Sequence, residues 1–220
     1  MNLINRTYSK DSPTIVVDFD GTLIRQDLGE LFSEWLRKEN LISRWHLLKS
    51  TPLGLVNYLS RNIFEFPLCN RMLMPFDYEL LSRKAASFVA LAKHDIEINT
   101  PLLDLISKYE GNRILLTGSL EILVLQFLNQ MQIDCFDRVI GQTHGHRGWF
   151  LNPTPFGRRK PQFVDFSIEI AIANDRSDRH LLGRAKHQYV VLPSTQSRPK
   201  WADSSFELME FGAAINDQWR

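Results

Sequence analysis

The sequence predicts an α/β protein with a Rossmann-like parallel sheet and a helical domain inserted after the first strand. Five short apolar segments read as strands: residues 14–19, 113–117, 138–141, 169–173 and 188–192. Helical patterns lie between several of these segments, and near-continuous apolar strands separated by helices are typical of a parallel sheet. About eighty residues of mainly helical pattern separate the first strand from the second.

We therefore expect a core domain of residues 1–24 and 111–220 and a helical cap domain of residues 25–110. The chain has 220 residues, of which 44% are hydrophobic and 23% charged. That length and composition suit one large domain, or one core that carries an insert.

The first strand ends in two carboxylates, Asp18 and Asp20, which follow the β-branched and apolar residues 14–17. Residues two apart in a strand point to the same side, so both acids should face one pocket at the carboxyl edge of the sheet. Two close carboxylates repel each other, and a divalent cation would resolve the conflict. Mg²⁺ is the natural candidate because it prefers hard oxygen ligands. A simple Asp-Gly turn would explain Asp20 and Gly21 but not Asp18.

Four amphipathic segments fill the insert. The first begins near Asp27, and its apolar residues follow helical spacing: Leu28, Leu31, Phe32, Trp35 and Leu36. Helices are also expected after Thr51, after Asp77, where Leu81, Phe88, Leu91 and Ala92 form the apolar side, and from Thr100 to Gly111. An insert at this point would cover the carboxylates like a lid.

The second strand ends in Thr117, Gly118 and Ser119, and Ser119 is predicted to cap the helix that follows. Hydroxyl groups and unpaired backbone N–H groups at such a position can receive a phosphate. Taken alone this signal is weak, because Ser and Thr cap helices routinely.

Residues 142–151 are predicted to form a hairpin, and Lys160 follows in a basic loop. His144 and His146 would share one face of the hairpin, but no third metal ligand is spaced nearby. Pro161 suits the first turn of a helix, and a fixed Lys160 ammonium could neutralise a charged nucleophile and a phosphate together.

The fourth strand ends in residues 174–178, which place Asp175 and Asp178 at the same edge as the first two acids. A third metal ligand thereby becomes available, although an Asp-capped helix would explain this segment alone. The last part of the chain is predicted to hold a helix over residues 205–215, with Phe206, Met209 and Ala213 inward.

Composition argues against several other classes of protein. No apolar run reaches the roughly 18 residues of a membrane span, the first dozen residues lack a signal peptide's apolar segment, and Cys69 and Cys135 form no metal or disulfide pattern. We therefore expect a cytoplasmic protein with buried thiols. Residues 147–200 hold ten Lys or Arg against four Asp or Glu. That excess favours an anionic ligand over nucleic acid, although a solvated basic surface would also explain it.

Taken together and in order, these segments resemble the haloacid dehalogenase-like superfamily of phosphohydrolases. The first motif of that family, DxDGT, matches residues 18–22, and its second, an apolar run ending in Thr or Ser, matches residues 114–117. Its third motif is a Lys, here Lys160, and its fourth is an acidic cluster, here Asp175 and Asp178. The insert is similar to the first type of cap, as in phosphoserine phosphatase-like members. A narrower similarity to the phosphatidylglycerophosphatase C branch rests on residues 24–28 and 148–151.

This resemblance implies a Mg²⁺-dependent phosphatase in which Asp18 attacks phosphorus and Asp20 acts as acid and then base. Thr117, Gly118, Ser119 and Lys160 would bind the phosphate. The metal would be held by Asp18, the backbone carbonyl of Asp20 and Asp175, with Asp178 behind them or acting through water. Asp20 also argues against a true dehalogenase, because those members do not use an acid at this place.

The chain departs from the family pattern at two points. Asn174 precedes Asp175 where Gly is usual, and Asp178 follows three residues on instead of four. The interval from Lys160 to Asp175 is also short, so Arg158 or Arg159 remains an alternative cation, although a guanidinium does not replace an ammonium well. A non-catalytic binding protein and a phosphotransferase of the same fold are the competing hypotheses. A small phosphorylated metabolite or a phosphorylated lipid would be the substrate, and the sequence leaves the oligomeric state open.

Overall fold

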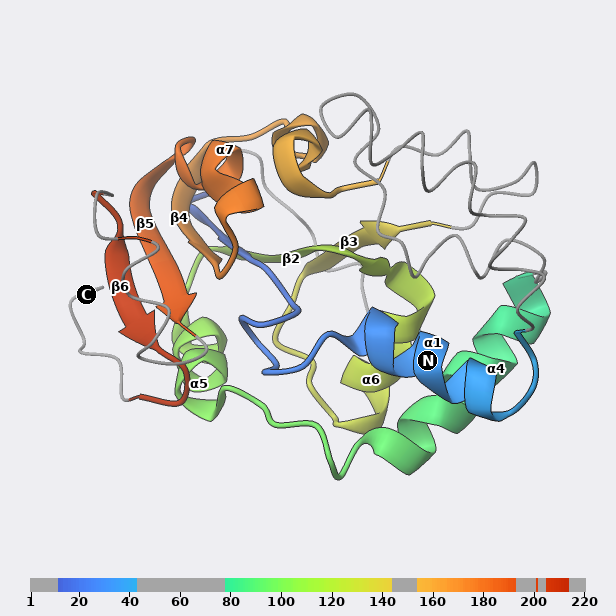
Figure 1. Ribbon diagram of the computed structural model, residues 1–220. Helices are drawn as coiled ribbons and strands as arrows, with labels where there is room; N and C mark the ends of the chain where they lie inside the picture. The colour runs from blue at the N-terminus through green and yellow to red at the C-terminus, as the bar shows by residue number, and fades with distance from the viewer. Residues whose placement is uncertain (1–11, 43–77, 144–153, 193–200, 202–204, 214–220) are drawn as a thin grey trace.

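A computed structural model describes residues 12–42, 78–143, 154–192, 201 and 205–213 (Figure 1). Its centre is a six-stranded sheet in which every neighbouring pair is parallel, in the order β3-β2-β1-β4-β5-β6. The strands are β1 (Thr14–Val17), β2 (Asn112–Leu120), β3 (Arg138–Gln142), β4 (Ile168–Ala173), β5 (Ala185–Leu192) and β6 (Glu207–Glu210). This is the doubly wound Rossmann order, and its direction reverses between β1 and β4. The predicted Rossmann-like parallel sheet is confirmed.

Helices cover both faces of the sheet (Figure 1). One face carries α1 (Leu28–Lys38), α4 (Tyr78–Ala92), α5 (Thr100–Lys108) and α6 (Glu121–Gln130). The other carries α7 (Arg179–Leu182) with the 3-10 helices η2 (Gly157–Phe163) and η3 (Arg176–Asp178). Alternation along β1 separates the two apolar cores, because Ile15 and Val17 pack toward the first group of helices and Val16 toward the second.

Two described helices of the insert, α1 and α4, pack on α6. Phe32, Trp35 and Phe88 form an aromatic cluster between α1 and α4, with Phe32 and Phe88 ring centroids 5.3 Å apart. The predicted helices near Asp27, after Asp77 and from Thr100 correspond to α1, α4 and α5. The buried side of α4 is formed by Leu81, Ala85, Phe88 and Val89, whereas Leu91 is 66% exposed. The helix expected after Thr51 lies outside the described residues, and the division into core and cap stays a prediction.

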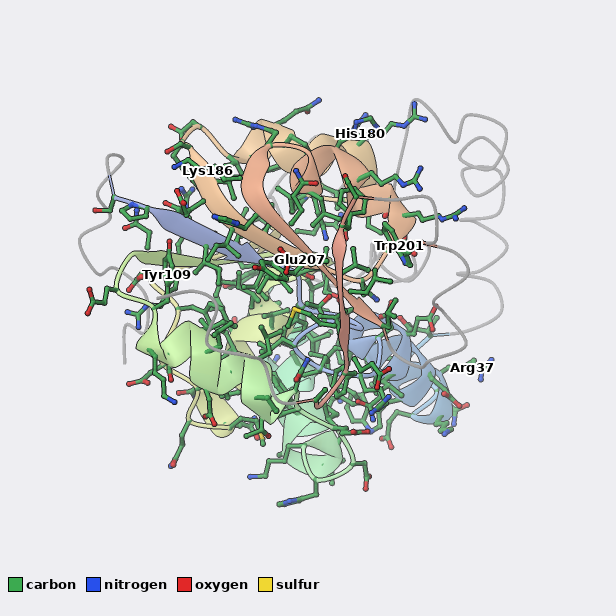
Figure 2. The ribbon with its side chains drawn as sticks, turned by 90° about the vertical axis from the view of Figure 1, so that its left-hand side faces the viewer. Arg37, Tyr109, His180, Lys186, Trp201 and Glu207 are labelled. Atoms are coloured by element: carbon green, nitrogen blue, oxygen red, sulfur yellow. The ribbon has the colours of Figure 1, made fainter. Side chains whose placement is uncertain are left out.

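The helix predicted over residues 205–215 is wrong. Residues Glu207–Glu210 form β6, which extends the sheet beside β5 in parallel register, Tyr189 opposite Glu207. Figure 2 faces this edge of the sheet, where Glu207 lies on the outermost strand. Met209 and Phe211 pack on the core while Leu208 is exposed, which is the two-residue alternation of a strand.

The predicted cap of α6 by Ser119 is also wrong. Strand β2 continues through a shift in register to Leu120, and α6 begins at Glu121 with Leu120 at its cap position. The Ser119 N–H donates to the Thr117 hydroxyl at 3.0 Å, which is a local turn that competes with helix initiation. The extra strand residues place the Ser119 side chain on the carboxyl edge of the sheet.

Candidate active site

The end of β1 lies beside β4, where the order of the sheet reverses, and this is where doubly wound proteins bind ligands. The Asp18 N–H donates to Ile172 of β4 at 2.8 Å, so Asp18 is still held by the sheet. Beyond it, the carbonyl of Phe19 accepts from three successive N–H groups, those of residues 22, 23 and 24. Gly21 takes a φ of +71°, which a larger residue would resist, and the chain turns tightly there.

Lys160 lies between two carboxylates. Its Nζ is 2.7 Å from Asp18 Oδ1 and 2.9 Å from Asp178 Oδ1, and the side chain is 3% exposed. Burial alone would lower the pKa of the ammonium, but Asp178 and Asp18 outweigh it and raise that pKa. Lys160 of η2 therefore points at Asp18, an arrangement that fits the role implied for it by the family resemblance.

Asp178 is the more deeply buried of the two carboxylates that contact Lys160. Burial raises its pKa to about 7 against the opposing effect of the Lys160 ammonium, and the charge of Asp18 adds to the rise. The Lys160 ammonium thus faces the carboxylates of both Asp18 and Asp178. Asp178, which was predicted to lie behind the metal ligands, forms an ion pair with Lys160.

Asp20 has a different environment, made of neutral donors. Its Oδ1 accepts from the Leu28 N–H at 2.8 Å, and its Oδ2 accepts from the Ser119 hydroxyl at 2.7 Å and the Thr117 hydroxyl at 3.3 Å. Burial, followed by the charge of Asp27, raises the pKa of Asp20 to about 7 in spite of these hydrogen bonds. An acid with such a pKa can both give and take a proton near neutral pH.

Thr117, Gly118 and Ser119 lie where phosphate contacts were predicted, but both hydroxyls are directed at Asp20. Gly118 lies against the ring of Phe156, and a Cβ at position 118 would come within 2.6 Å of Phe156 Cδ2. Phe156 immediately precedes η2, so it joins the second-strand edge of the site to the helix that carries Lys160.

Asp175 follows β4 and is exposed, and its Oδ1 accepts from the Ser177 N–H at 2.7 Å. Asn174 packs on the turn after β1, since a Cβ on Gly21 would lie 1.9 Å from Asn174 Nδ2. The amide of Asn174 therefore occupies space that the usual Gly of the fourth motif would leave empty.

Most of these residues line one cavity of about 320 Å³, but Thr117, which is fully buried, is not part of its lining. Its described lining is Asp18, Asp20, Asp27, Gly118, Ser119, Phe156, Lys160, Asn174, Asp175, Ser177 and Asp178. Five of these side chains are acidic and one is basic, an imbalance that a cation would relieve. Within the described ranges no group of three or more His, Cys, Asp or Glu side chains forms a ready-made metal cluster. The hard oxygen donors of Asp18, Asp20 and Asp175 nevertheless suit Mg²⁺, which uses few protein ligands.

Asp27 was expected only to begin a helix, and it proves to be part of the cavity lining. Its carboxylate caps α1 by accepting from the Glu30 N–H at 2.8 Å, and the surrounding protein raises its pKa. The signal that could have located it is its place at a helix start a few residues beyond the paired acids. His144 and His146 lie outside the described residues.

The model of the family described as haloacid dehalogenase-like hydrolase matches residues 15–182 of this chain. The chain belongs to that family. The match runs from β1 through Lys160 to α7, so it includes all four segments that meet at the cavity. A search of curated proteins found no significant match.

Solved structures share the fold of this family member at low sequence identity. A protein with unknown function from Bordetella pertussis Tohama I superposes with a TM-score of 0.68 and 12% identity, covering 91% of this chain and 99% of that one. A phosphoserine phosphohydrolase-like protein from Francisella tularensis subsp. tularensis SCHU S4 gives 0.52 and 15%, covering 90% and 94%. Cytosolic 5′-nucleotidase IIIB bound to cytidine gives 0.55 and 12%, covering 94% and 84%.

Among the described residues, no helix of this haloacid dehalogenase-like protein is long and apolar enough to cross a membrane. The single described cysteine, Cys135, is a free, buried thiol whose pKa burial raises to about 11. The prediction of a buried thiol is confirmed for Cys135, and Cys69 lies outside the described residues.

Proposed function

We propose that this protein is a Mg²⁺-dependent phosphatase that hydrolyses a phosphate monoester through an aspartyl-phosphate on Asp18. The observation that carries the proposal is the pairing of two adjacent acids with opposite surroundings. Asp18 is bound to an ammonium, and Asp20 is bound to hydroxyl and N–H groups and has a pKa of about 7. The first, paired with an ammonium, is suited to act as the nucleophile and the second to transfer protons.

In the first half of the reaction, a carboxylate oxygen of Asp18 attacks phosphorus and the bond to the leaving oxygen breaks. Protonated Asp20 gives its proton to that oxygen, so the product leaves as an alcohol. Because the Leu28 N–H and Ser119 hydroxyl hold Asp20 from two sides, its carboxyl group is fixed beside the nucleophile.

In the second half, ionised Asp20 takes a proton from water, and the water oxygen attacks the phosphorus of the aspartyl-phosphate. The bond between phosphorus and the Asp18 oxygen breaks, which releases inorganic phosphate and restores the carboxylate. Lys160, 2.7 Å from Asp18, stabilises the negative charge on both the nucleophile and the transferred phosphoryl group.

Asp18, Asp175 and the backbone carbonyl of Asp20 would hold Mg²⁺, which when bound offsets charge developing on the phosphoryl oxygens. The acidic lining of the cavity supports this ligand set. Asp178, already paired with Lys160, would act behind these ligands and position the ammonium.

The experiment is phosphate release from p-nitrophenyl phosphate with and without Mg²⁺. We expect turnover that chelation abolishes and that Asp18→Asn lowers by at least about a thousandfold. Asp104→Asn, an exposed acid on α5, is the control and should keep full activity. No turnover of any phosphate ester, together with no Mg²⁺ binding in a calorimetric titration, would instead support a non-catalytic role.

The substrate class is proposed more broadly, as a small phosphorylated metabolite or a phosphorylated lipid. The described cavity of about 320 Å³ is large enough for a phosphate with a small attached group. A release screen over phospholipid, sugar and amino-acid phosphates would separate these alternatives. Adding an alcohol acceptor and measuring a new phosphate ester would detect a phosphotransferase.

A further inference from the structure

Asn99 connects the turn after β1, residues 18–24, to Gly212, which lies more than one hundred residues further along the chain. We call residues 18–24 the catalytic turn. Its side chain is 2% exposed, and both ends of the amide are used. Nδ2 donates to the Thr22 carbonyl at 3.2 Å, and Oδ1 accepts from the Gly212 N–H at 3.2 Å. A carbonyl can only accept and an N–H can only donate, so these two partners fix the orientation of the amide.

The side chain of Asn99 makes these contacts instead of capping the helix that follows it. Asn99 precedes α5 at the cap position, where an Asn side chain normally accepts from an N–H of the first helical turn. Here it makes no capping hydrogen bond. Its own N–H donates to Leu23 at 2.8 Å instead, which gives the turn a second anchor.

The anchored turn is the one that carries the two catalytic acids. The Thr22 hydroxyl is 3.5 Å from Asp18 Oδ2, and Thr22 stands two positions after Asp20. A shift of the Thr22 carbonyl would therefore move the backbone that presents both acids. Misplacement of reacting groups by about 1 Å can lower a rate about a hundredfold.

The segment after β6 reinforces this arrangement. The Phe211 N–H donates to Leu192 of β5 at 3.0 Å, and the chain then passes beside α5 (Figure 1). The Arg25 guanidinium lies 4.3 Å from the Phe211 ring centroid and also binds Glu97, with Nη2 2.8 Å from Oε1. Ile24 and Ile98 form an isolated antiparallel bridge. Arg25 and Asn99, which follow these two residues, are both joined to the segment after β6 at the edge of the sheet.

We propose that Arg25, Asn99, Phe211 and Gly212 form a brace that holds the catalytic turn in place, with Asn99 as its positioning residue. The inference rests on the proposed function only for its kinetic readout. The brace itself is a property of the folded chain, and a second readout tests it without any activity.

Asn99→Asp, studied at pH 8, removes the hydrogen bond to the Thr22 carbonyl, because an ionised carboxylate still accepts from the Gly212 N–H but cannot donate to a carbonyl. Phe211→Ala removes the ring that contacts the Arg25 guanidinium and leaves the side chain of Asn99 unchanged. The control is Asn112→Asp. Asn112 is another buried Asn, 7% exposed, whose Nδ2 donates to Thr14 Oγ1 at 3.1 Å at the opposite end of β1.

Amide hydrogen exchange over residues 18–28 is measured for all three full-length variants, with kcat and KM for aryl phosphate hydrolysis. Asn99→Asp should speed exchange there about tenfold or more and lower kcat about tenfold to a hundredfold, with KM changed less than about threefold. Phe211→Ala should do the same to a smaller extent. Asn112→Asp should lower Tm but leave exchange in this segment and kcat unchanged.

Unchanged exchange and kcat in Asn99→Asp, or equal effects in Asn112→Asp, would overturn the proposal. If the protein shows no phosphatase activity at all, the proposed function fails, and the exchange measurement still decides whether the brace exists.

Discussion

Asp18 and Asp20 are two residues apart on one turn, yet their carboxylates have different partners on the two sides of the cavity. On the η2 side, Asp18 faces the Lys160 ammonium at 2.7 Å. On the β2 side, Asp20 faces the hydroxyls of Thr117 and Ser119, and Asp27 adds a repulsive charge. The difference shows how one motif can supply two chemical roles, since one acid is paired with a cation while burial raises the pKa of the other.

Removing the cation should have the largest effect. Lys160→Met leaves Asp18 and Asp178 buried without a counter-charge, and we expect a loss of about 3–5 kcal/mol in the free energy of unfolding. Urea unfolding in chelator at pH 7.5 measures it. Burial already raises the pKa of Asp178, and loss of the ammonium that opposes this rise would raise it further, so the loss should shrink as the pH falls toward 5. Arg158→Met, an exposed change two residues away, is the control, and an equal loss there would contradict the interpretation.

Removing the second acid should stabilise the protein while it abolishes turnover. The pKa of folded Asp20, about 7, lies above the ordinary value of 3.8, so its ionisation makes stability fall as the pH rises from 4 to 7. Asp20→Asn removes that dependence. In chelator it should be more stable than the parent by about 1–2 kcal/mol at pH 8, with the gain lost by pH 4.

Thermal unfolding of both proteins across this pH range tests the prediction. Asp104→Asn, on exposed α5, should show no pH-dependent gain. If the difference in stability between Asp20→Asn and the parent is the same at pH 8 as at pH 4, then Asp20 is not held in the environment described.

The smallest effect should come from one hydroxyl. Ser119→Ala removes a donor to Asp20 Oδ2, which raises the pKa of Asp20 further. We expect a loss of about 1 kcal/mol at pH 8 and less at pH 5, because the hydrogen bond is stronger to the ionised acid. Ser33→Ala removes a buried hydroxyl bonded to the neutral Gly29 carbonyl at 2.8 Å, and its cost should not change with pH. A pH-independent loss in Ser119→Ala would contradict the assignment.

The sequence was enough to predict the parallel sheet and the residues at its carboxyl edge. The runs at residues 15–17 and 170–173 are buried on both faces, so their apolar character is continuous and visible. Asp18 and Asp20 were also predictable, because no ordinary strand end needs two acids on one side. Lys160 could be chosen over its neighbours only through the family resemblance, since three basic residues stand in a row.

Other features depend on contacts that local patterns do not contain. Strand β6 has four residues and one exposed Leu, too short an alternation to be distinguished from a helix. Ser119 looked like a helix cap because its neighbours Thr117 and Leu120 gave no sign that the strand continues past a shift in register. Asn99 carried no signal at all, since both partners of its side chain are distant in sequence.

Gly118 and Phe156 pack against each other at the wall of the cavity, so a larger side chain at position 118 requires the ring of Phe156 to move. A methyl group at position 118 collides with the ring, while a smaller residue at position 156 opens a void beside the lysine-bearing helix. Related chains should therefore exchange bulk between these two sites in a correlated way. For the engineer, the pair offers a means of reshaping the recess: a library that varies both positions jointly should yield functional combinations that neither single substitution can reach.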